Sequence, residues 1–275
     1  MREREERLSS MPRTCTFFIG PAGVGKTTLV RNVSEIHATF KTINLDPASY
    51  DTEYQVDIRS LIDIDILMEE CEIGPNNALL KVFDLLYSDS ELKSNFSNEL
   101  ENLTDYDLLV DCPGQLEIYL HNDSFKNIVQ DMFSKRYRVL FIYCTDVNGP
   151  ERKFITSCVF SALIGARFEY PFINLLTKCD MRTIRDENHP DNEKSDMNKE
   201  NGKKDFSEMD LTTNDSGYID RLGDISKNDS DALKRSLLEF LSSYGPSFLP
   251  ISEDEDLLNR LKGEIHACVN LDYED

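Results

Sequence analysis

The chain has 275 residues, enough for one large α/β domain with a substantial core. Its 30 basic and 51 acidic side chains give a formal net charge of −21 at pH 7, and a field of that sign repels nucleic acid and anionic lipid. We therefore expect no direct nucleic-acid partner and no membrane partner. The acidity either serves solubility alone or favours protein partners with basic surfaces.

The apolar and cysteine patterns also bear on the cellular compartment. No apolar stretch reaches the roughly 18 residues of a membrane span, and the charged N-terminus lacks the apolar core of a secretion signal. The seven cysteines include no C-x-x-C pair, which predicts free thiols without a zinc site or a disulfide framework. We expect a protein of a reducing compartment, the cytoplasm.

The first ten residues read as a disordered charged extension, and the domain itself is expected at residues 11–275. Six apolar, β-prone runs are separated by helical stretches, which implies crossover connections and a mostly parallel sheet. The predicted fold class is α/β, a three-layer α/β/α sandwich. The predicted strands are at residues 14–19, 42–45, 108–111, 139–144, 172–176 and 248–251.

Three helices and one insertion complete the expected organisation. Residues 154–166 read as a buried helix, and residues 231–244 carry four leucines on one face before Gly245. The capping-box pattern at residues 252–255 begins a further helix. The chain is polar between the first and the second of these helices, from residue 182 to residue 230. We interpret residues 186–228 as a surface insertion into the same domain.

The stretch from Gly20 to Thr27 matches G-x-x-x-x-G-K-[ST], the phosphate-binding loop of the P-loop NTPases, at every fixed position. The strand before it and the helix after it are the context that the motif requires. Lys26 would reach the β- and γ-phosphates, and the Thr27 hydroxyl would ligate Mg²⁺. The residues expected to hold the phosphates are Gly20, Gly23, Val24, Gly25, Lys26, Thr27 and Thr28.

The sequence Asp111-Cys112-Pro113-Gly114-Gln115 follows a predicted buried strand. An acid at that strand tip would hold Mg²⁺ directly or through water, which makes Asp111 the second predicted metal ligand. The Gly114 amide can sense a γ-phosphate, and Gln115 is placed to orient the attacking water.

Residues 177–180, T-K-C-D, also end a predicted strand and fit [NT]-K-x-D, the guanine-reading motif. The Asp180 carboxylate can accept hydrogen bonds from the guanine N1–H and 2-amino group, a pattern that adenine does not offer. The Lys178 stem would cover the base. Thr177 replaces the more usual Asn and weakens the contact to the other base edge.

Asp46 follows the second predicted strand in N-L-D-P-A. Two interpretations are open for it: ordering the nucleophilic water near the phosphates, or merely starting an Asp-Pro turn. Gly74-Pro75-Asn76 is, taken alone, an ordinary turn.

These five motifs in this order resemble the GPN-loop GTPases, over residues 11–271, and most resemble the third eukaryotic paralogue. The resemblance implies a homodimer or a heterodimer with another GPN-loop GTPase. It also implies that Gly74, Pro75 and Asn76 of one subunit reach the other's site, where Asn76 contacts the γ-phosphate region. One departure is Asn77, where the family has Gly, and we expect the tolerance of Asn for positive φ to preserve the loop.

The resemblance further implies a role in assembling RNA polymerase II and importing it into the nucleus, with shuttling of the protein to the nucleus. The sequence thus predicts a dimeric switch that binds GTP or GDP with Mg²⁺ and hydrolyses GTP, with Asp46, Asn76 and Gln115 as catalytic residues. Two alternatives are a GTP-bound scaffold without turnover and a P-loop kinase, which would need cationic side chains over the transferred phosphate.

Overall fold

The computed structural model describes residues 13–50, 53–146, 151–179, 248–251 and 255–271. The N-terminal extension, the insertion predicted at 186–228, the helix predicted at 231–244 and Asp180 lie outside the described residues. The division of the chain into an extension, a domain and an insertion therefore stays a prediction.

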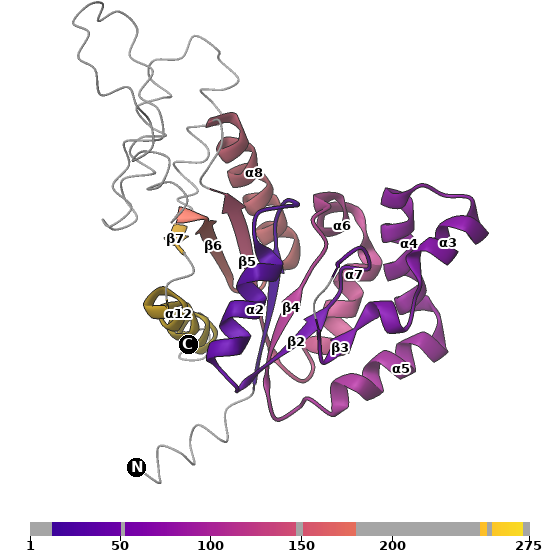
Figure 1. Ribbon diagram of the computed structural model, residues 1–275, viewed down its shortest axis with the longest axis horizontal. Coiled ribbons are helices and arrows are strands. Elements are labelled where there is room, and N and C mark those ends of the chain that lie inside the picture. The colour runs from indigo at the N-terminus through magenta and orange to yellow at the C-terminus, as the bar shows by residue number, and fades with distance from the viewer. Residues whose placement is uncertain (1–12, 51–52, 147–150, 180–247, 252–254, 272–275) are drawn as a thin grey trace, which may run out of the picture.

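A parallel sheet of seven strands forms the centre of the molecule, in the order β3-β2-β4-β1-β5-β6-β7 (Figure 1). Every neighbouring pair in it is parallel. Each of the six predicted strands is present, within two residues at either end. The strands are β1 (Thr14–Ile19), β2 (Phe40–Asn44), β3 (Val56–Asp57), β4 (Asp107–Asp111), β5 (Arg138–Asp146), β6 (Phe172–Thr177) and β7 (Phe248–Pro250).

The seventh strand, β3, was not predicted. It has two residues, so it offers no run of alternating or continuous apolar side chains for a pattern to detect. It pairs with the end of β2, with Ile43 opposite Val56 and Asn44 opposite Asp57. This short edge strand thereby brings Asp57 beside the carboxyl end of β2.

Helices cover both faces of the sheet. The described helices are α2 (Lys26–Ile36), α3 (Ile64–Cys71), α4 (Pro75–Ser88), α5 (Ser90–Glu101), α6 (Leu116–His121), α7 (Asp123–Ile128), α8 (Glu151–Phe168) and α12 (Glu255–Leu271), with a 3₁₀ turn η1 (Ile58–Ser60) and a π turn η2 (Val129–Phe133). The helices predicted near 154–166 and after 255 are confirmed as α8 and α12. Among the described helices, none is both long enough and apolar enough to cross a bilayer.

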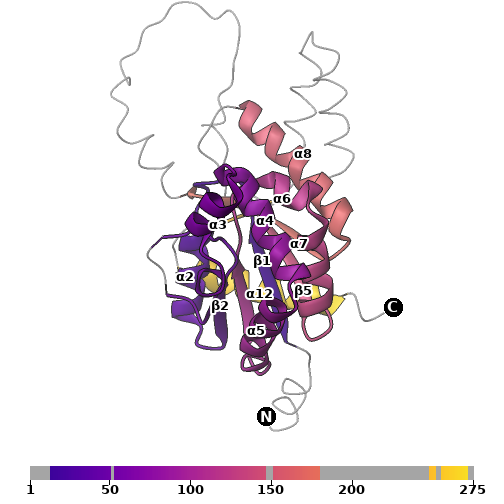
Figure 2. The ribbon, with the colours of Figure 1, turned by 90° about the vertical axis from the view of Figure 1, so that its right-hand side faces the viewer.

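The alternation of side chains along the strands produces two separate cores. Phe18 of β1 packs with α2 and α12 on one face, and Phe17, its neighbour, packs with α4, α7 and η2 on the other. Figure 2 shows α3, α4 and α5 along the side that faces the viewer. The three-layer α/β/α sandwich predicted from the sequence is confirmed, and all pairings in the described sheet are parallel.

Strand register aligns the carboxyl ends of the central strands. Phe18 of β1 and Asn44 of β2 each lie opposite Asp111 of β4, and Asp146 of β5 lies opposite Thr177 of β6. Ligands of open α/β sheets bind outside these ends. The predicted motifs at 20–27, 111–115 and 177–178 therefore meet at one edge of the sheet.

Candidate nucleotide site

The phosphate-binding loop links β1 to α2 and is closely packed. Gly20 has φ of 138°, and a Cβ there would lie 2.3 Å from the carbonyl oxygen of Cys144 on β5. Both the backbone angle and the space require glycine. Lys26 is buried beneath the loop, and its ammonium donates to the carbonyl oxygens of Gly20 (3.0 Å) and Pro21 (3.1 Å). The loop is thus already wrapped around the cation that is expected to meet the phosphates.

Thr27 and Asp111, the two predicted metal ligands, are in contact. The Thr27 hydroxyl donates to Oδ2 of Asp111 at 2.6 Å, and the Tyr54 hydroxyl donates to the same oxygen at 2.7 Å. The other carboxylate oxygen, Oδ1, is buried and has no hydrogen-bond partner among the described residues. Burial raises the pKa of Asp111, although the bonds from Thr27 and Tyr54 and the charge of Lys26 oppose that rise.

This donor set fits Mg²⁺. A hydroxyl and a carboxylate are hard oxygen ligands, and the unsatisfied Oδ1 of Asp111 is an acceptor that a cation would complete. Tyr54, which the sequence analysis did not single out, shares the carboxylate. Tyr54 belongs to none of the sequence motifs and precedes a strand that was not predicted, so no sequence pattern pointed to its contact with Asp111.

Asp46 follows β2, and the structure gives support to both of its interpretations. Its Oδ1 accepts from the Ala48 amide at 3.0 Å, so the Asp-Pro turn forms. Burial raises the pKa of Asp46, with Asp111 adding to the rise and Lys26 and Arg59 opposing it. The carboxylate therefore starts a turn and also lies within the electrostatic reach of the phosphate-binding lysine.

The turn after β4 rests on the phosphate-binding loop. A Cβ on Gly114 would lie 2.7 Å from both the Cα and the backbone nitrogen of Ala22. The Tyr119 hydroxyl, buried in α6, donates to the Pro113 carbonyl oxygen and holds the turn from behind. Gln115 is the N-cap residue of α6 and is partly exposed. A change at the phosphates would therefore reach α6 directly through Gly114.

The T-K segment at the end of β6 is seated on the same loop. The Thr177 hydroxyl lies 2.6 Å from the Val24 carbonyl oxygen and 3.2 Å from that of Thr145. Lys178, at φ 60°, donates to the Gly23 carbonyl oxygen at 2.7 Å and to Oδ2 of Asp146 at 3.2 Å. The predicted base-binding and phosphate-binding segments are thus brought together, and Asp180, the expected guanine reader, lies outside the described residues.

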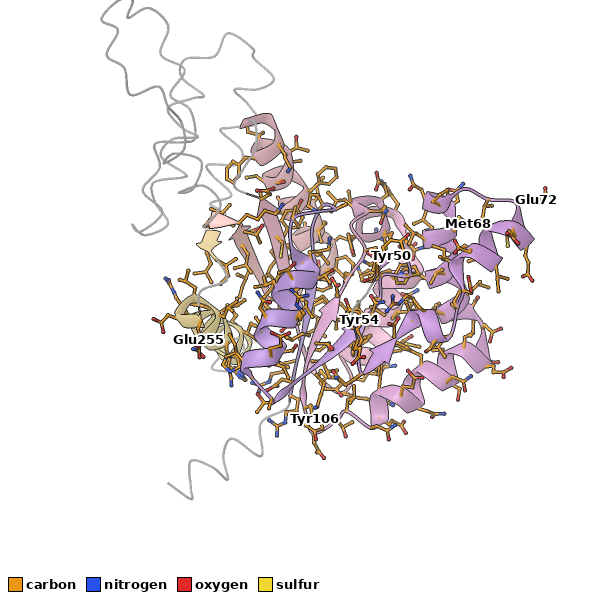
Figure 3. All side chains as sticks on the ribbon, in the orientation of Figure 1. Tyr50, Tyr54, Met68, Glu72, Tyr106 and Glu255 are labelled. Atoms are coloured by element: carbon orange, nitrogen blue, oxygen red, sulfur yellow. The ribbon has the colours of Figure 1, made fainter. Side chains whose placement is uncertain are left out.

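The GPN segment occupies the N-terminus of α4. Gly74 is its N-cap residue, Pro75 takes the first helical position, and both Asn76 and Asn77 are exposed in the first turn. Asn77 lies in regular helix, so the tolerance of Asn for positive φ is not used there; the positive φ of this turn is at Glu72 (53°). Figure 3 shows Glu72 at the outer tip of the α3–α4 pair, well away from Tyr54.

Comparisons with known proteins agree with this geometry. A family model described as "Conserved hypothetical ATP binding protein" matches residues 18–256. GPN-loop GTPase 3 of Yarrowia lipolytica is 35% identical over 187 residues, covering 64% of this chain and 67% of that protein. GPN-loop GTPase 3 of Mycosarcoma maydis is 27% identical over 272 residues, covering 94% of this chain and 92% of that protein.

The chain belongs to the GPN-loop GTPase family. The predicted resemblance to this family is confirmed, as is the enzyme class that it implies, a GTP hydrolase. The crystal structure of a GTPase in apo form from Pyrococcus abyssi has the same fold, with a TM-score of 0.66 and 20% identity, covering 94% of this chain and 98% of that one.

Proposed function

We propose that this GPN-loop GTPase binds GTP with Mg²⁺, hydrolyses it, and uses the γ-phosphate to set the conformation of a dimer. The observation that carries the proposal is that Thr177 and Lys178 form hydrogen bonds to the loop that surrounds the Lys26 ammonium. A base-reading segment fixed to a phosphate-reading segment fits a guanine nucleotide, because the next residues of the motif supply Asp180.

Each residue has a defined part in that chemistry. Lys26 and the loop amides bind the phosphates, and Thr27 and Asp111 would hold Mg²⁺, which neutralises charge developing on the β- and γ-oxygens. Asp46 accepts a proton from, or orients, the attacking water, and Gln115 fixes the water's second hydrogen bond. Gly114 senses the γ-phosphate with its backbone amide. Catalysis is then mostly positioning and charge stabilisation.

The first experiment is a phosphate-release assay on the purified full chain. GTP with Mg²⁺ should release phosphate, ATP should not, and a nucleoside acceptor should leave the GTP rate unchanged. Release from ATP alone, or transfer to the acceptor, would contradict the proposal in favour of a kinase. Tight GTP binding with no release of phosphate would contradict hydrolysis and favour the alternative of a GTP-bound scaffold without turnover.

We also propose that Asn76 acts on the site of a second subunit. Two observations support this: Asn76 is exposed on the first turn of α4, and Figure 1 shows α4 apart from α2, the helix that follows the phosphate-binding loop. An amide donor brought in by a partner would stabilise charge on the departing phosphate. The partner is a second copy of this chain or another GPN-loop GTPase.

Mixing two inactive variants tests the shared site. Lys26→Ala removes nucleotide binding but keeps Asn76, whereas Asn76→Ala binds nucleotide but offers no donor to its neighbour. The mixed dimer should regain up to one working site, and Asn77→Ala, one residue further along the same exposed turn, is the matched control that should retain turnover. Proven subunit exchange without recovery would place the action of Asn76 within its own subunit.

We further propose that the protein serves RNA polymerase II assembly and nuclear import, acting in the cytoplasm and shuttling to the nucleus. The support is its membership of the GPN-loop family, taken with the implication of the sequence resemblance. Depleting the protein should leave RNA polymerase II in the cytoplasm, and the wild-type chain but not Lys26→Ala should restore import. Normal import after depletion would overturn this part.

A further inference from the structure

A closed ring of hydrogen bonds surrounds the turn that begins at Asp46. The Asp46 amide donates to Oδ1 of Asn44 at 2.9 Å, and the Asn44 side-chain amide donates to Oδ1 of Asp57 at 2.9 Å. The Arg59 guanidinium donates hydrogen bonds to both carboxylate oxygens of Asp57 and to the Ser49 carbonyl oxygen, the last at 2.7 Å. The Ser49 amide donates back to the Asp46 carbonyl oxygen at 3.1 Å and closes the ring.

Asn44, Asp57 and Arg59 are each held by more than one contact. Asn44 is fully buried at the end of β2, and its strand neighbour in the sheet is Asp57 itself. Asp57 also accepts from the Arg59 backbone amide at 2.9 Å, which fixes the start of η1. The Arg59 fork then makes two parallel bonds to the carboxylate, a geometry that lysine cannot reproduce.

The ring exceeds what capping of η1 requires. Capping uses the bond between Asp57 and the Arg59 amide, whereas the guanidinium extends further, to the Ser49 carbonyl in the loop that carries Asp46. The far end of the loop between β2 and β3 is held separately, because the Tyr54 hydroxyl donates to Asp111 and the Gln55 amide donates to the Thr42 carbonyl oxygen. The ring adds an attachment on both sides of Asp46, because its amide donates to Asn44 and its carbonyl oxygen accepts from the Ser49 amide.

We propose that Asn44, Asp57 and Arg59 are positioning residues for Asp46: they hold its backbone so that its carboxylate meets the attacking water beside the γ-phosphate. The inference rests on the proposed GTP hydrolysis, and it adds three residues that act through Asp46 without touching the nucleotide. A misplacement of a reacting group by about 1 Å can cost on the order of 100-fold in rate, so the ring needs to shift only slightly to matter.

Arg59→Lys and Asp57→Asn test the proposal, alone and combined. Arg59→Lys keeps the charge but loses the pair of parallel hydrogen bonds to Asp57. Asp57→Asn keeps the shape of the side chain but removes its charge, which weakens its bonds with the guanidinium. Each should lower kcat by roughly 10- to 100-fold with KM for GTP nearly unchanged, and the double variant should be little worse than either, because all three break one ring. Arg31→Lys, on the exposed face of α2, is the matched control and should match the wild type.

Hydrogen exchange gives a readout that does not depend on turnover. In the GDP complex, the Ala48 and Ser49 amides should exchange faster in both variants than in the wild type, with amides of β1 and β4 unchanged. Equal kcat and equal exchange in the variants would overturn the inference. A loss confined to Arg59→Lys, with raised KM, would also overturn it, since Arg59 would then contact the phosphate itself. An inactive wild type would instead overturn the proposed hydrolysis.

Discussion

The ammonium of Lys178 donates a 2.7 Å hydrogen bond to the Gly23 carbonyl oxygen, so the end of β6 is tied to the loop between β1 and α2. These residues are 155 positions apart in the chain. Thr177 makes a second tie, to Val24. The two bonds hold the end of β6 against the phosphate-binding loop, so that two motifs far apart in the sequence lie side by side.

Replacing Thr177 by Val should weaken both stability and nucleotide binding. The substitution conserves shape but removes the hydroxyl that bonds to the Val24 carbonyl oxygen, which leaves a buried acceptor without its donor. We expect a loss of about 1–3 kcal/mol in the free energy of unfolding. Urea unfolding and a GTP titration measure the two effects. Thr177→Ser keeps the hydroxyl and should stay close to the wild type; equal behaviour of Val and wild type would refute the role of this bond.

Gly114→Ala should uncouple γ-phosphate sensing from binding. The new Cβ would lie 2.7 Å from backbone atoms of Ala22, which cannot rotate away, so the turn must move off the phosphate-binding loop. We expect a large fall in kcat with a smaller effect on GDP affinity. Gly263→Ala in α12 is the control: a Cβ there meets nothing within 4 Å, and the change should stabilise the helix by up to about 1 kcal/mol. Full GTPase activity in Gly114→Ala would show that the contact has no functional role.

The Asp57–Arg59 pair should make the free energy of unfolding depend on pH in the acidic range. Burial opposes ionisation of Asp57, but the hydrogen bonds from Arg59 and Asn44 together outweigh it and hold the pKa of Asp57 below its ordinary value. The stabilisation is therefore complete above the pKa of an unfolded aspartate and is lost as pH falls through the lower pKa of the folded state. Urea unfolding between about pH 2 and pH 6 should show a shallower acid loss in Asp57→Asn. Identical slopes would contradict the assignment.

The sequence predicted those parts of the fold and the site that have long apolar runs or motifs of fixed spacing. Continuous apolar runs predicted six strands correctly, because buried parallel strands carry apolar side chains on both faces. Motifs with fixed spacing correctly placed Lys26, Thr27 and Asp111 together, because the loop and the strand end are adjacent in any sheet of this order. β3 was missed because a two-residue strand holds no period, and Tyr54 and Arg59, which flank it, were missed with it.

The tight contact of Thr177 with Val24 was also beyond sequence reasoning. The weakened contact to the base that was expected of Thr177 in place of Asn stays a prediction, and the bond of its hydroxyl to the phosphate-binding loop is a separate finding. The motif pattern does not reveal this bond, because it depends on how the end of β6 lies against a loop far away in the sequence. The tolerance of Asn for positive φ, invoked for Asn77, is not needed, because Pro75 is preorganised for the first helical turn and α4 continues through Asn77.

Lys26→Ala should reduce nucleotide affinity by about 2–4 kcal/mol, as expected when a buried charged partner is removed. The same change also frees the carbonyl oxygens of Gly20 and Pro21, so thermal stability should fall slightly in the absence of nucleotide. Isothermal titration with GDP and a melting curve measure the two effects. Lys41→Ala, a lysine that lies over the Tyr106 ring, should leave affinity unchanged. Normal GDP binding by Lys26→Ala would show that this loop is not the phosphate site.

The central claim is that this site reads guanine, and a nucleotide-swap titration tests it most directly. The wild-type chain should prefer GTP over ATP by a factor on the order of 10⁴, since adenine leaves the Asp180 carboxylate unpaired. Asp180→Asn should lose GTP affinity and gain xanthosine triphosphate, whose 2-carbonyl accepts from the new amide. Loss of GTP with gain of xanthosine triphosphate is the result that we predict. Unchanged GTP affinity in Asp180→Asn, or equal binding of ATP and GTP by the wild type, would contradict the account.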